Sequence, residues 1–346
     1  MPKAVRLSDI AKRVNVSTVT VSKALTGQKG VSESMRAEIV ELAEKMGYVK
    51  NSTAARVPGN SSHTLGVIVA ERYLNENQSF YWSLYQEISQ RALQKNCFTM
   101  LEVISYADEK EKQLPKILSE NKAEGLIIMG AFKTDYALFL NREVQVPKIN
   151  LDTPGVNDSS DSVVSNNMMG GYLMTNYLFG LGHRKIGFVG TRLATASIDD
   201  RYLGYLKSLM EHGVKPREEW LIDDRDREYG KVDYEQYFRL PSGMPTAFFC
   251  NCDLSASLLI RKLQEAGYNV PKDISVAGFD NYLNEQIINV GITTYEINTR
   301  EMANRAVHIL TRKLENANYS TGMFMLAGKF IERNSAVRIG PPVPLA

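Results

Sequence analysis

The sequence predicts a small all-α domain at the N-terminus, of the helix-turn-helix type, followed by a much larger α/β region built from two doubly wound parallel sheets. Three observations support this fold class. Helical apolar periodicity fills the first fifty residues, apolar runs alternate with amphipathic stretches from His63 onward, and that alternation occurs in two successive series. With 346 residues, the chain is long enough for two or three domains.

The first fifty residues contain the pattern of three helices. The apolar side chains of the first helix fall on one face, at Leu7, Ile10, Ala11 and Val14. Residues 15–17 interrupt this face, and the Ser17 hydroxyl can cap the next helix by accepting hydrogen bonds from its free amides. In the second helix, the side chains of Val21, Ala24 and Leu25 are predicted to face the interior of the domain. The third helix is predicted over residues 33–46, with Ser32 as its cap and Gly47 as its stop.

The second helix leaves small polar side chains and one cation on its outer side. Such side chains suit a helix that enters the major groove of DNA, where they meet base edges and phosphates. We expect base-edge contacts from Thr18, Val19 and Lys23, and contacts to phosphates or to the turn itself from Ser17, Thr20 and Ser22. The alternative is a three-helix interaction module that does not touch DNA.

The charge distribution agrees with a DNA-binding head. Residues 1–60 carry ten Lys and Arg against five acidic residues, a formal charge of +5. Since the whole chain has a formal charge of +2, the remaining 286 residues carry −3. A basic head on a slightly acidic body suits phosphate binding, although an ordinary solvated surface would have the same composition.

From His63 onward the chain reads as repeated βα units. The predicted strands are residues 65–70, 98–103, 125–130, 147–152, 185–190, 247–250 and 274–279. The predicted helices are residues 80–95, 110–121, 168–181, 200–211 and 255–266. Repeated βα units imply parallel sheets with helices on both faces, and two series imply two lobes. Ligands of such sheets bind beyond the carboxyl ends of the strands, so we expect a site in the cleft between the lobes.

Three motifs carry a resemblance to a known family. The first is D-I-A-x-x-x-x-V-S-x-x-T-V-S-x-x-L over residues 9–25, which is followed by V-S and then by G-Y. The others are L-G-H-R-K-I-G-F at residues 181–188 and F-I-E-R-N-S at residues 330–335. On these residues the chain resembles the lactose-repressor/galactose-repressor (LacI/GalR) family, from Val5 to Val337.

The resemblance implies a transcriptional repressor that binds a near-palindromic operator in double-stranded DNA as a homodimer. It also implies a body similar to periplasmic sugar-binding proteins, with a small-molecule effector, a mono- or disaccharide, between the two lobes. The effector would change operator affinity by moving the lobes. A corepressor-type regulator that responds to a purine, a sugar phosphate or a partner protein is the alternative. A sugar-binding protein that does not bind DNA is a further one.

The resemblance also implies the domain organisation. We expect a helix-turn-helix domain at residues 1–50, a hinge segment at 51–62, an effector-binding and dimerisation core at 63–338 and a tail at 339–346. Within the core, the N-terminal lobe is expected at residues 63–164 and 294–322, and the C-terminal lobe at residues 165–292 and 323–338.

The hinge segment departs from the family pattern. In the family this segment is a helix that lies in the minor groove, and the resemblance assigns DNA contacts to Asn51, Ala54 and Val57. Val57 stands where the family has leucine, and Pro58 follows it directly. Valine is a poorer helix former and a shallower wedge between base pairs, so a flexible tether is the alternative for this segment.

Polar side chains that can hold a polyol follow the predicted strands. Asp152 and Asp280 end strands of the first and second series, where carboxylates can accept from pairs of sugar hydroxyls. The resemblance makes both of them effector contacts together with Arg201, and it places Cys252 where the family has asparagine. Stacking faces for the sugar ring are expected from Phe80, Tyr81 and Phe279. Caps or hinge positions are the alternative for the aspartates, and for Asp253 a helix cap is the preferred interpretation.

The sequence gives no support for catalysis. It contains no G-x-S-x-G, Walker, H-E-x-x-H or G-x-G-x-x-G motif, and its four histidines are scattered, so we expect no enzyme, no cofactor and no metal site. Three cysteines without an export signal predict reduced thiols in a cytoplasmic protein. No run of about 18 apolar residues is present, so no membrane span or membrane partner is expected.

Overall fold

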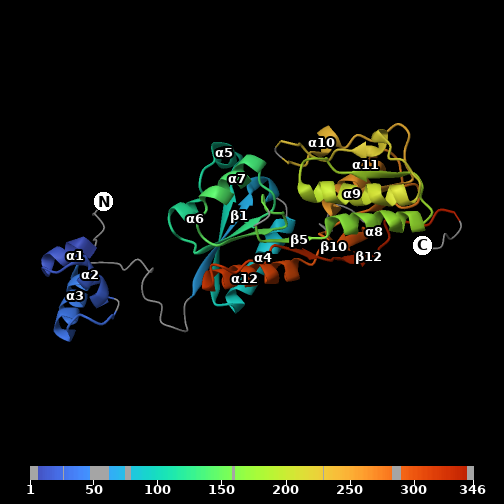
Figure 1. Ribbon diagram of the computed structural model, residues 1–346. Coiled ribbons are helices and arrows are strands. Elements are labelled where there is room, and N and C mark those ends of the chain that lie inside the picture. Colours follow the sequence, from blue (N-terminus) through green and yellow to red (C-terminus); the bar gives the residue numbers. More distant parts are fainter. Residues whose placement is uncertain are drawn as a thin grey trace. The chain divides into compact units, whose positions relative to one another are not determined.

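The computed structural model describes residues 7–25, 27–46, 62–74, 79–157, 160–228, 230–282 and 290–340. The chain divides into two compact units, Met1–Ser61 and Ser62–Ala346 (Figure 1). Among the described residues, no helix has the length and apolar composition that crossing a membrane requires.

The first unit has the predicted helices, α1 (Leu7–Arg13), α2 (Thr18–Leu25) and α3 (Glu33–Lys45). The Ser17 hydroxyl caps α2 as predicted, since it accepts a hydrogen bond from the Thr20 amide at 3.0 Å. Asn15, in the turn between α1 and α2, has a left-handed φ of 51°, a conformation that asparagine tolerates better than most residues. The three helices bury a common core of Ile10, Ala11, Val21, Ala24, Ile39 and Ala43. Gly47, the predicted stop, lies outside the described residues.

The first lobe of the second unit is built on a parallel sheet with the strand order β11-β5-β4-β3-β1-β2 among the described residues. Its strands are β1 (His63–Ala70), β2 (Cys97–Ile104), β3 (Gly125–Met129), β4 (Lys148–Leu151), β5 (Ser162–Ser165) and β11 (Met323–Leu326). The short helix η1 (Glu71–Tyr73) follows β1.

Helices cover both faces of this sheet because its strands alternate apolar side chains between the faces. Val67 and Val69 share a core with one face, which carries α4 (Phe80–Gln94) and α12 (Thr299–Glu315). Ile68 shares a core with the other face, which carries α5 (Tyr106–Glu111), α6 (Lys116–Ser119) and α7 (Thr134–Glu143) (Figure 1).

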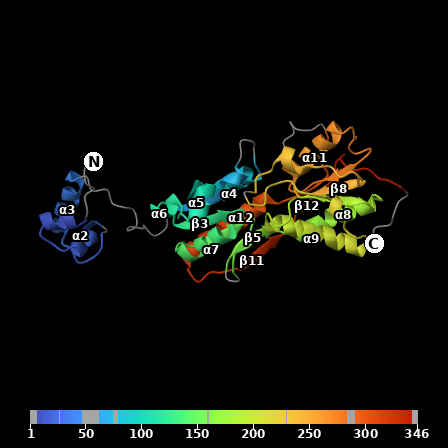
Figure 2. The same ribbon diagram turned by 90° about the horizontal axis from the view of Figure 1, so that it is seen from above.

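The second lobe (Figure 2) repeats this architecture on a smaller parallel sheet, whose strand order among the described residues is β7-β6-β8-β9. Its strands are β6 (Ile186–Val189), β7 (Leu221–Ile222), β8 (Ala247–Cys250) and β9 (Ser275–Ala277). Helices α8 (Asn167–Gly180) and α9 (Ala196–Glu211) pack together on one face, and α11 (Asp253–Glu265) packs on the other. The remaining elements of the lobe are η2 (Glu218–Trp220) and α10 (Tyr234–Tyr237).

Strands β10 (Thr294–Glu296) and β12 (Lys329–Ile331) form a separate antiparallel pair. The expected placement of residues 323–338 in the second lobe is wrong for β11, which pairs in parallel with β5 of the first-lobe sheet. The Asp161 carboxylate explains this, because it accepts hydrogen bonds from the amides of Thr321 and Gly322 at 2.7 and 2.8 Å. These contacts fix the segment that leads into β11 beside β5.

The predicted helix over residues 110–121 is also wrong. The α5 helix ends at Glu111, its C-cap Lys112 has a left-handed φ of 54°, and α6 begins after Pro115. Proline has no amide hydrogen and disfavours the helical conformation in the residue before it, so one continuous helix cannot form here. The long helix α12 was not predicted from the sequence, and neither were the shorter elements η1, α7, η2, α10, β5, β7, β10, β11 and β12.

Candidate functional site

The outer side of α2 carries the side chains that the sequence assigns to DNA. Thr18 and Val19 are exposed, and the apolar Val19 side chain is 60% accessible. The Ser17 and Thr20 hydroxyls are hydrogen-bonded to each other at 2.8 Å, so both contribute to the turn. Ser22 and Lys23 are partly exposed on the same helix. The hinge residues Asn51, Ala54 and Val57 lie outside the described residues.

The end of α2 is held by a side chain that the sequence analysis counted only as a charge. One terminal nitrogen of the Arg36 guanidinium donates to the carbonyl oxygens of Lys23 and Ala24 at 3.3 and 3.1 Å. The other donates to the Gln28 carbonyl oxygen at 2.7 Å. A cation that donates hydrogen bonds to the last carbonyl groups of a helix satisfies acceptors that would otherwise be unpaired. Arg36 therefore stabilises the C-terminal end of α2.

A cleft of about 390 Å³ lies between the two lobes of the second unit. Asp152 follows β4 of the first lobe and Asp280 follows β9 of the second, so both sheets direct their carboxyl ends toward it. Both aspartates have left-handed backbones, with φ of 59° and 89° respectively. Such strained conformations concentrate at functional sites, because the surrounding structure must enforce them.

Asp152 is buried, at 8% exposure, and is bound on one side only. Its Oδ2 accepts a hydrogen bond from the Tyr81 hydroxyl at 2.8 Å, while its Oδ1 has no partner among the described residues. Burial raises the pKa of Asp152, and the guanidinium of Arg201 opposes this rise. Among the described residues, this second oxygen is therefore a buried acceptor without a donor.

Asp253 is the most deeply buried carboxyl group of the cleft, at 1% exposure. Neither of its carboxyl oxygens has a hydrogen-bond partner among the described residues. Burial, and then the neighbouring Asp280, raise the pKa of Asp253 well above its usual range. Burial raises the pKa of Asp280 to about 7 against the opposing effect of Arg201. This pair therefore retains protons near neutral pH, where ordinary aspartates are ionised.

The preferred cap assignment for Asp253 is wrong. The N-cap of α11 is Cys252, whose Sγ accepts a hydrogen bond from the Ser255 amide at 3.4 Å. Asp253 is instead the first residue of the helix and lines the cleft. Cys252 also lines the cleft as expected, and burial raises the pKa of its thiol.

Arg201 is held rigidly at the cleft. Its Nε donates to the Asn167 Oδ1 at 2.9 Å, and one terminal nitrogen donates to the Asn251 carbonyl oxygen at 2.6 Å. The guanidinium lies over the Phe279 ring, at 3.9 Å from its centroid. Its other terminal nitrogen makes no hydrogen bond within the described part of the chain. A planar fork fixed in this way can give its remaining donors to a ligand.

Phe279 does not have the role that the sequence suggested. Its side chain is fully buried beneath Arg201, so it has no face left for a sugar ring. The aromatic side chains that line the cleft are those of Tyr73, Phe80, Tyr81, Tyr234 and Tyr282. Tyr73 and Tyr81 lie with their ring centroids 4.5 Å apart. Phe80 and Tyr81 thus line the cleft as expected, and Phe279 supports Arg201 from below.

An ion pair in the wall of the cleft, between Asp224 and Arg225, was not predicted from the sequence. The Asp224 side chain is fully buried and receives two hydrogen bonds from the Arg225 guanidinium, at 2.9 and 2.8 Å. Asp224 also accepts from Asn251 and Ser255. These donors hold the pKa of Asp224 far below its usual range, in spite of its burial. The adjacent Asp-Asp-Arg letters in the sequence contain no periodic signal from which this pairing could be found.

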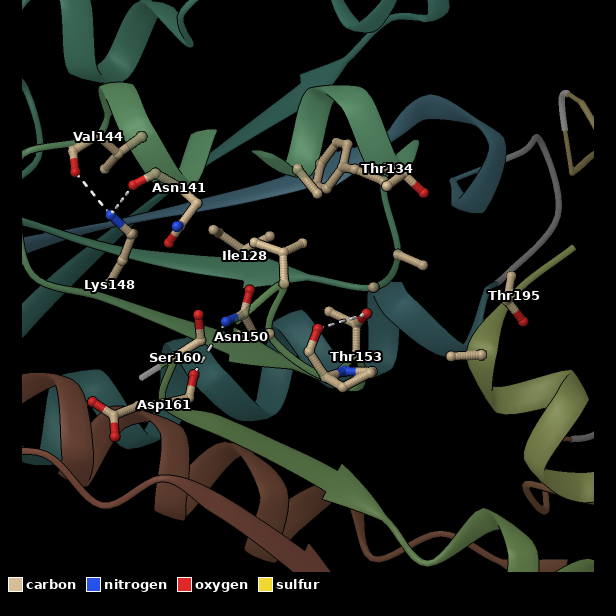
Figure 3. A pocket seen from close by; sticks show the side chains of 18 of the residues that line it. Ile128, Thr134, Asn141, Val144, Lys148, Asn150, Thr153, Ser160, Asp161 and Thr195 are labelled. Atoms are coloured by element: carbon tan, nitrogen blue, oxygen red, sulfur yellow. Dashed lines mark hydrogen bonds between the residues drawn. The ribbon is translucent and has the colours of Figure 1, made fainter. Parts of the chain in front are cut away.

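A larger cavity, of about 780 Å³, lies beside α7 and extends to residues 193–196 of the second lobe (Figure 3). Its charged groups are used by the fold. The Lys148 ammonium donates to the carbonyl oxygens of Asn141 and Val144, both at 2.9 Å, and Asp161 pairs with Lys313. None of the residues that the sequence assigns to an effector lines this cavity. The smaller cleft is therefore the candidate site.

Two family models match the chain. One, described as bacterial regulatory proteins of the lacI family, matches residues 6–51, and one described as a periplasmic binding protein-like domain matches residues 175–336. Similar curated proteins are the HTH-type transcriptional repressors PurR of Aliivibrio salmonicida and Yersinia pestis. The first is 26% identical over 96% of this chain and 99% of its own length, and the second is 27% identical over 97% of both.

Solved structures share the fold over nearly the whole chain. A complex of the transcriptional regulator CelR with cellobiose has a TM-score of 0.67 at 19% identity, covering 96% of this chain and 100% of that one. The lac repressor dimer bound to operator and the anti-inducer ONPF has a TM-score of 0.64 at 22% identity, covering 97% of this chain and 100% of that one.

Proposed function

We propose, from the premise that this chain belongs to the lacI family of bacterial regulatory proteins, that it is a DNA-binding transcriptional repressor controlled by a small molecule in the interlobe cleft. The observation that carries the proposal is a cleft in which the fixed guanidinium of Arg201 acts on Asp152, one of whose buried carboxyl oxygens has no hydrogen-bond partner among the described residues. A chain that carries this cleft together with a helix-turn-helix unit has the parts of an effector-controlled regulator.

The charges of the cleft favour a neutral, hydroxyl-rich effector. Two of its arginines already have carboxylate partners, since Arg72 pairs with Glu109 and Arg225 pairs with Asp224. Arg201 opposes the carboxyl groups of Asp152 and Asp280, and the carboxyl group of Asp253 belongs to the same cleft. Hydroxyl groups can donate to these acceptors, whereas a phosphate would meet no uncompensated cation. We therefore propose a mono- or disaccharide, and the CelR complex with cellobiose provides a similar fold that holds such a ligand.

A thermal-shift screen of the purified chain tests this effector class. Neutral mono- and disaccharides, sugar phosphates and nucleobases are compared at equal concentrations. We expect a concentration-dependent rise in melting temperature with one or a few neutral sugars. A rise confined to sugar phosphates or nucleobases would contradict the neutral effector and favour the corepressor alternative. Whether the bound ligand raises or lowers operator affinity then separates corepressor from inducer.

For DNA, we propose that Thr18, Val19 and Lys23 contact base edges and that Ser17, Thr20 and Ser22 hold phosphates or the turn. The Lys23→Ala variant should bind operator more weakly by about 1–3 kcal/mol while its affinity for random duplex falls less, if Lys23 reads a base. Fluorescence anisotropy on a duplex selected from a random pool, and on a scrambled duplex, measures both affinities. Lys45→Ala is the control, because Lys45 is an exposed lysine of α3 that pairs with Glu41. Equal affinities of Lys23→Ala and wild type on both duplexes would remove this assignment.

We propose that the chain acts as a homodimer, so that two heads read the half-sites of a near-palindromic operator. The edge strand β2 and the helix α4 support this proposal, because they expose apolar side chains, namely Trp82, Leu93, Phe98, Met100 and Val103. Apolar patches and unpaired edge strands of this kind are typical of association surfaces.

The dimer surface can be tested with two matched variants. Met100→Glu places a charge on β2 and should shift the protein toward monomer in sedimentation velocity. Met325→Glu places the same charge on β11, at the opposite edge of the sheet, where the side chain is 53% exposed, and should leave the oligomeric state unchanged. If Met100→Glu stays as dimeric as wild type, the dimer does not form through β2.

A further inference from the structure

A short segment of the second lobe reaches across to the first lobe at the mouth of the cleft. This segment, which we call the clasp, consists of residues 224–228 and 230–232 and follows β7. Arg225 and Val232 form an antiparallel bridge at its base. Within the turn, the Asp226 amide donates to the Lys231 carbonyl oxygen at 3.0 Å, and the Gly230 amide donates to the Asp226 carbonyl oxygen at 2.9 Å. These bonds give the clasp a defined shape of its own.

Two hydrogen bonds between described residues join the far end of the clasp to the first lobe. The Tyr106 hydroxyl donates to the Glu228 Oε1 at 2.9 Å. The Lys133 ammonium donates to the Arg227 carbonyl oxygen at 3.3 Å. Tyr106 begins α5 and Lys133 precedes α7, so both donors belong to the first lobe.

Close packing accompanies these hydrogen bonds. Gly230, which has a left-handed φ of 69°, lies against the side chain of Arg72, and a Cβ atom at this position would come within 2.9 Å of the Arg72 Cδ. A side chain at residue 230 would therefore push the clasp away from the first lobe. Arg72 is itself fixed, because its guanidinium binds Glu109 and the Ala131 carbonyl oxygen.

The base of the clasp is anchored in the wall of the cleft. Arg225 lines the cleft, and its guanidinium is held by the fully buried Asp224. Asp224 is in turn fixed by the Thr191 amide, at 3.0 Å, and by Asn251 and Ser255. A ligand that contacts Arg225 thus contacts the rigid end of an element whose other end binds the opposite lobe.

We propose that the clasp is a closing device, which links effector contact at Arg225 to the approach of the two lobes. The proposal rests on the proposed function of the cleft. It adds the element that couples effector binding in the cleft to the movement of the lobes. The two hydrogen bonds join different lobes, so they form only when the lobes are close. They therefore favour the closed arrangement, and an effector that stabilises Arg225 in the wall adds to this preference.

Hydrogen–deuterium exchange of the full-length protein tests the clasp without any ligand. Tyr106→Phe removes the hydroxyl that reaches Glu228 and should increase exchange of the amides of residues 226–232 by at least about threefold. Tyr172→Phe is the matched control, because its hydroxyl donates to Glu211 at 2.6 Å within the second lobe. Lys133→Met is a second clasp variant and should act in the same direction. If the clasp variants exchange as Tyr172→Phe does, the closing role is wrong.

Operator affinity of the same variants tests transmission. Tyr106→Phe should change operator affinity by about threefold or more, in the direction opposite to that caused by a closing effector, while Tyr172→Phe should not. A clasp that loosens without any change in operator affinity would overturn the proposed coupling. Failure of the wild-type protein to bind any selected duplex would contradict the proposed repressor function. The exchange experiment would still decide whether the clasp holds the lobes together.

Discussion

The Arg201→Ala variant is expected to lose its effector response while its unliganded form still binds operator. The guanidinium is fixed by Asn167 and by the Asn251 carbonyl oxygen, and it opposes the carboxyl groups of Asp152 and Asp280 at the ends of the two sheets. Its loss removes a forked, charge-assisted donor from a buried site. Such truncations cost about 2–5 kcal/mol of binding free energy, which is roughly 30-fold or more in affinity.

Isothermal titration with the sugar identified by thermal shift measures this loss, and anisotropy on the operator duplex measures DNA binding. Arg201→Lys keeps the positive charge but not the planar fork, so it should recover only a small part of the affinity. Arg217→Ala, which removes an exposed arginine that lies over Trp220 outside the cleft, is the control. Unchanged sugar affinity in Arg201→Ala would show that the effector binds elsewhere.

The variant also carries a cost in stability that must be separated from its effect on binding. Without Arg201, the carboxyl groups of Asp152 and Asp280 lose the nearby cation that lowers their pKa values. The melting temperature should therefore fall, most strongly at pH values where these groups are ionised. Intact operator binding well below that temperature shows that the fold is retained.

The parts of the site that the sequence could predict are those with a local pattern. Asp152 and Asp280 end apolar strands, and parallel strands bring their carboxyl ends to one edge of each sheet, so their approach follows from topology. The helices of the first unit follow from their apolar spacing and the Ser17 cap. Arg201 required the family resemblance, because a single arginine in an amphipathic helix has no distinctive local signal.

The parts that sequence reasoning missed depend on packing between distant residues. Phe279 follows a strand as an exposed stacking residue would, yet Arg201 from α9 covers its ring. The pairing of Asp224 with Arg225 matters only because Asn251 and Ser255 come from another strand and helix to bury it. The position of β11 depends on Asp161, more than 150 residues earlier in the chain. Contacts of this separation leave no periodic trace in the sequence.

The second large effect expected is on the pH dependence of stability, through the carboxyl pair of Asp253 and Asp280. Burial raises the pKa of Asp280 to about 7, and burial together with the neighbouring Asp280 raises the pKa of Asp253 well above its usual range. An aspartate in the unfolded chain titrates near pH 3.9. Between these values the folded protein binds more protons than the unfolded one, so stability falls as pH rises.

The contribution of the pair is therefore complete below about pH 4 and is lost as pH rises through 7 and above. Asp280→Asn removes one of the two groups and should flatten the decline of the melting temperature between pH 5 and pH 8. At pH 8 the variant should gain up to a few kcal/mol of unfolding free energy, at about 1.4 kcal/mol per pKa unit. Because the two groups titrate together, Asp253→Asn should give a similar flattening.

Thermal unfolding followed by circular dichroism at half-unit pH steps measures this effect. Asp135→Asn, which neutralises an exposed carboxylate of α7, should leave the slope of melting temperature against pH unchanged. If the melting temperature of Asp280→Asn declined more steeply with pH than that of wild type, the raised pKa values of this pair would be contradicted. The same protons bear on the effector, because sugar hydroxyls donate to ionised carboxylates and so favour their deprotonation. Sugar affinity should therefore rise as pH increases from 6 to 8, and Asp280→Asn should remove most of that rise.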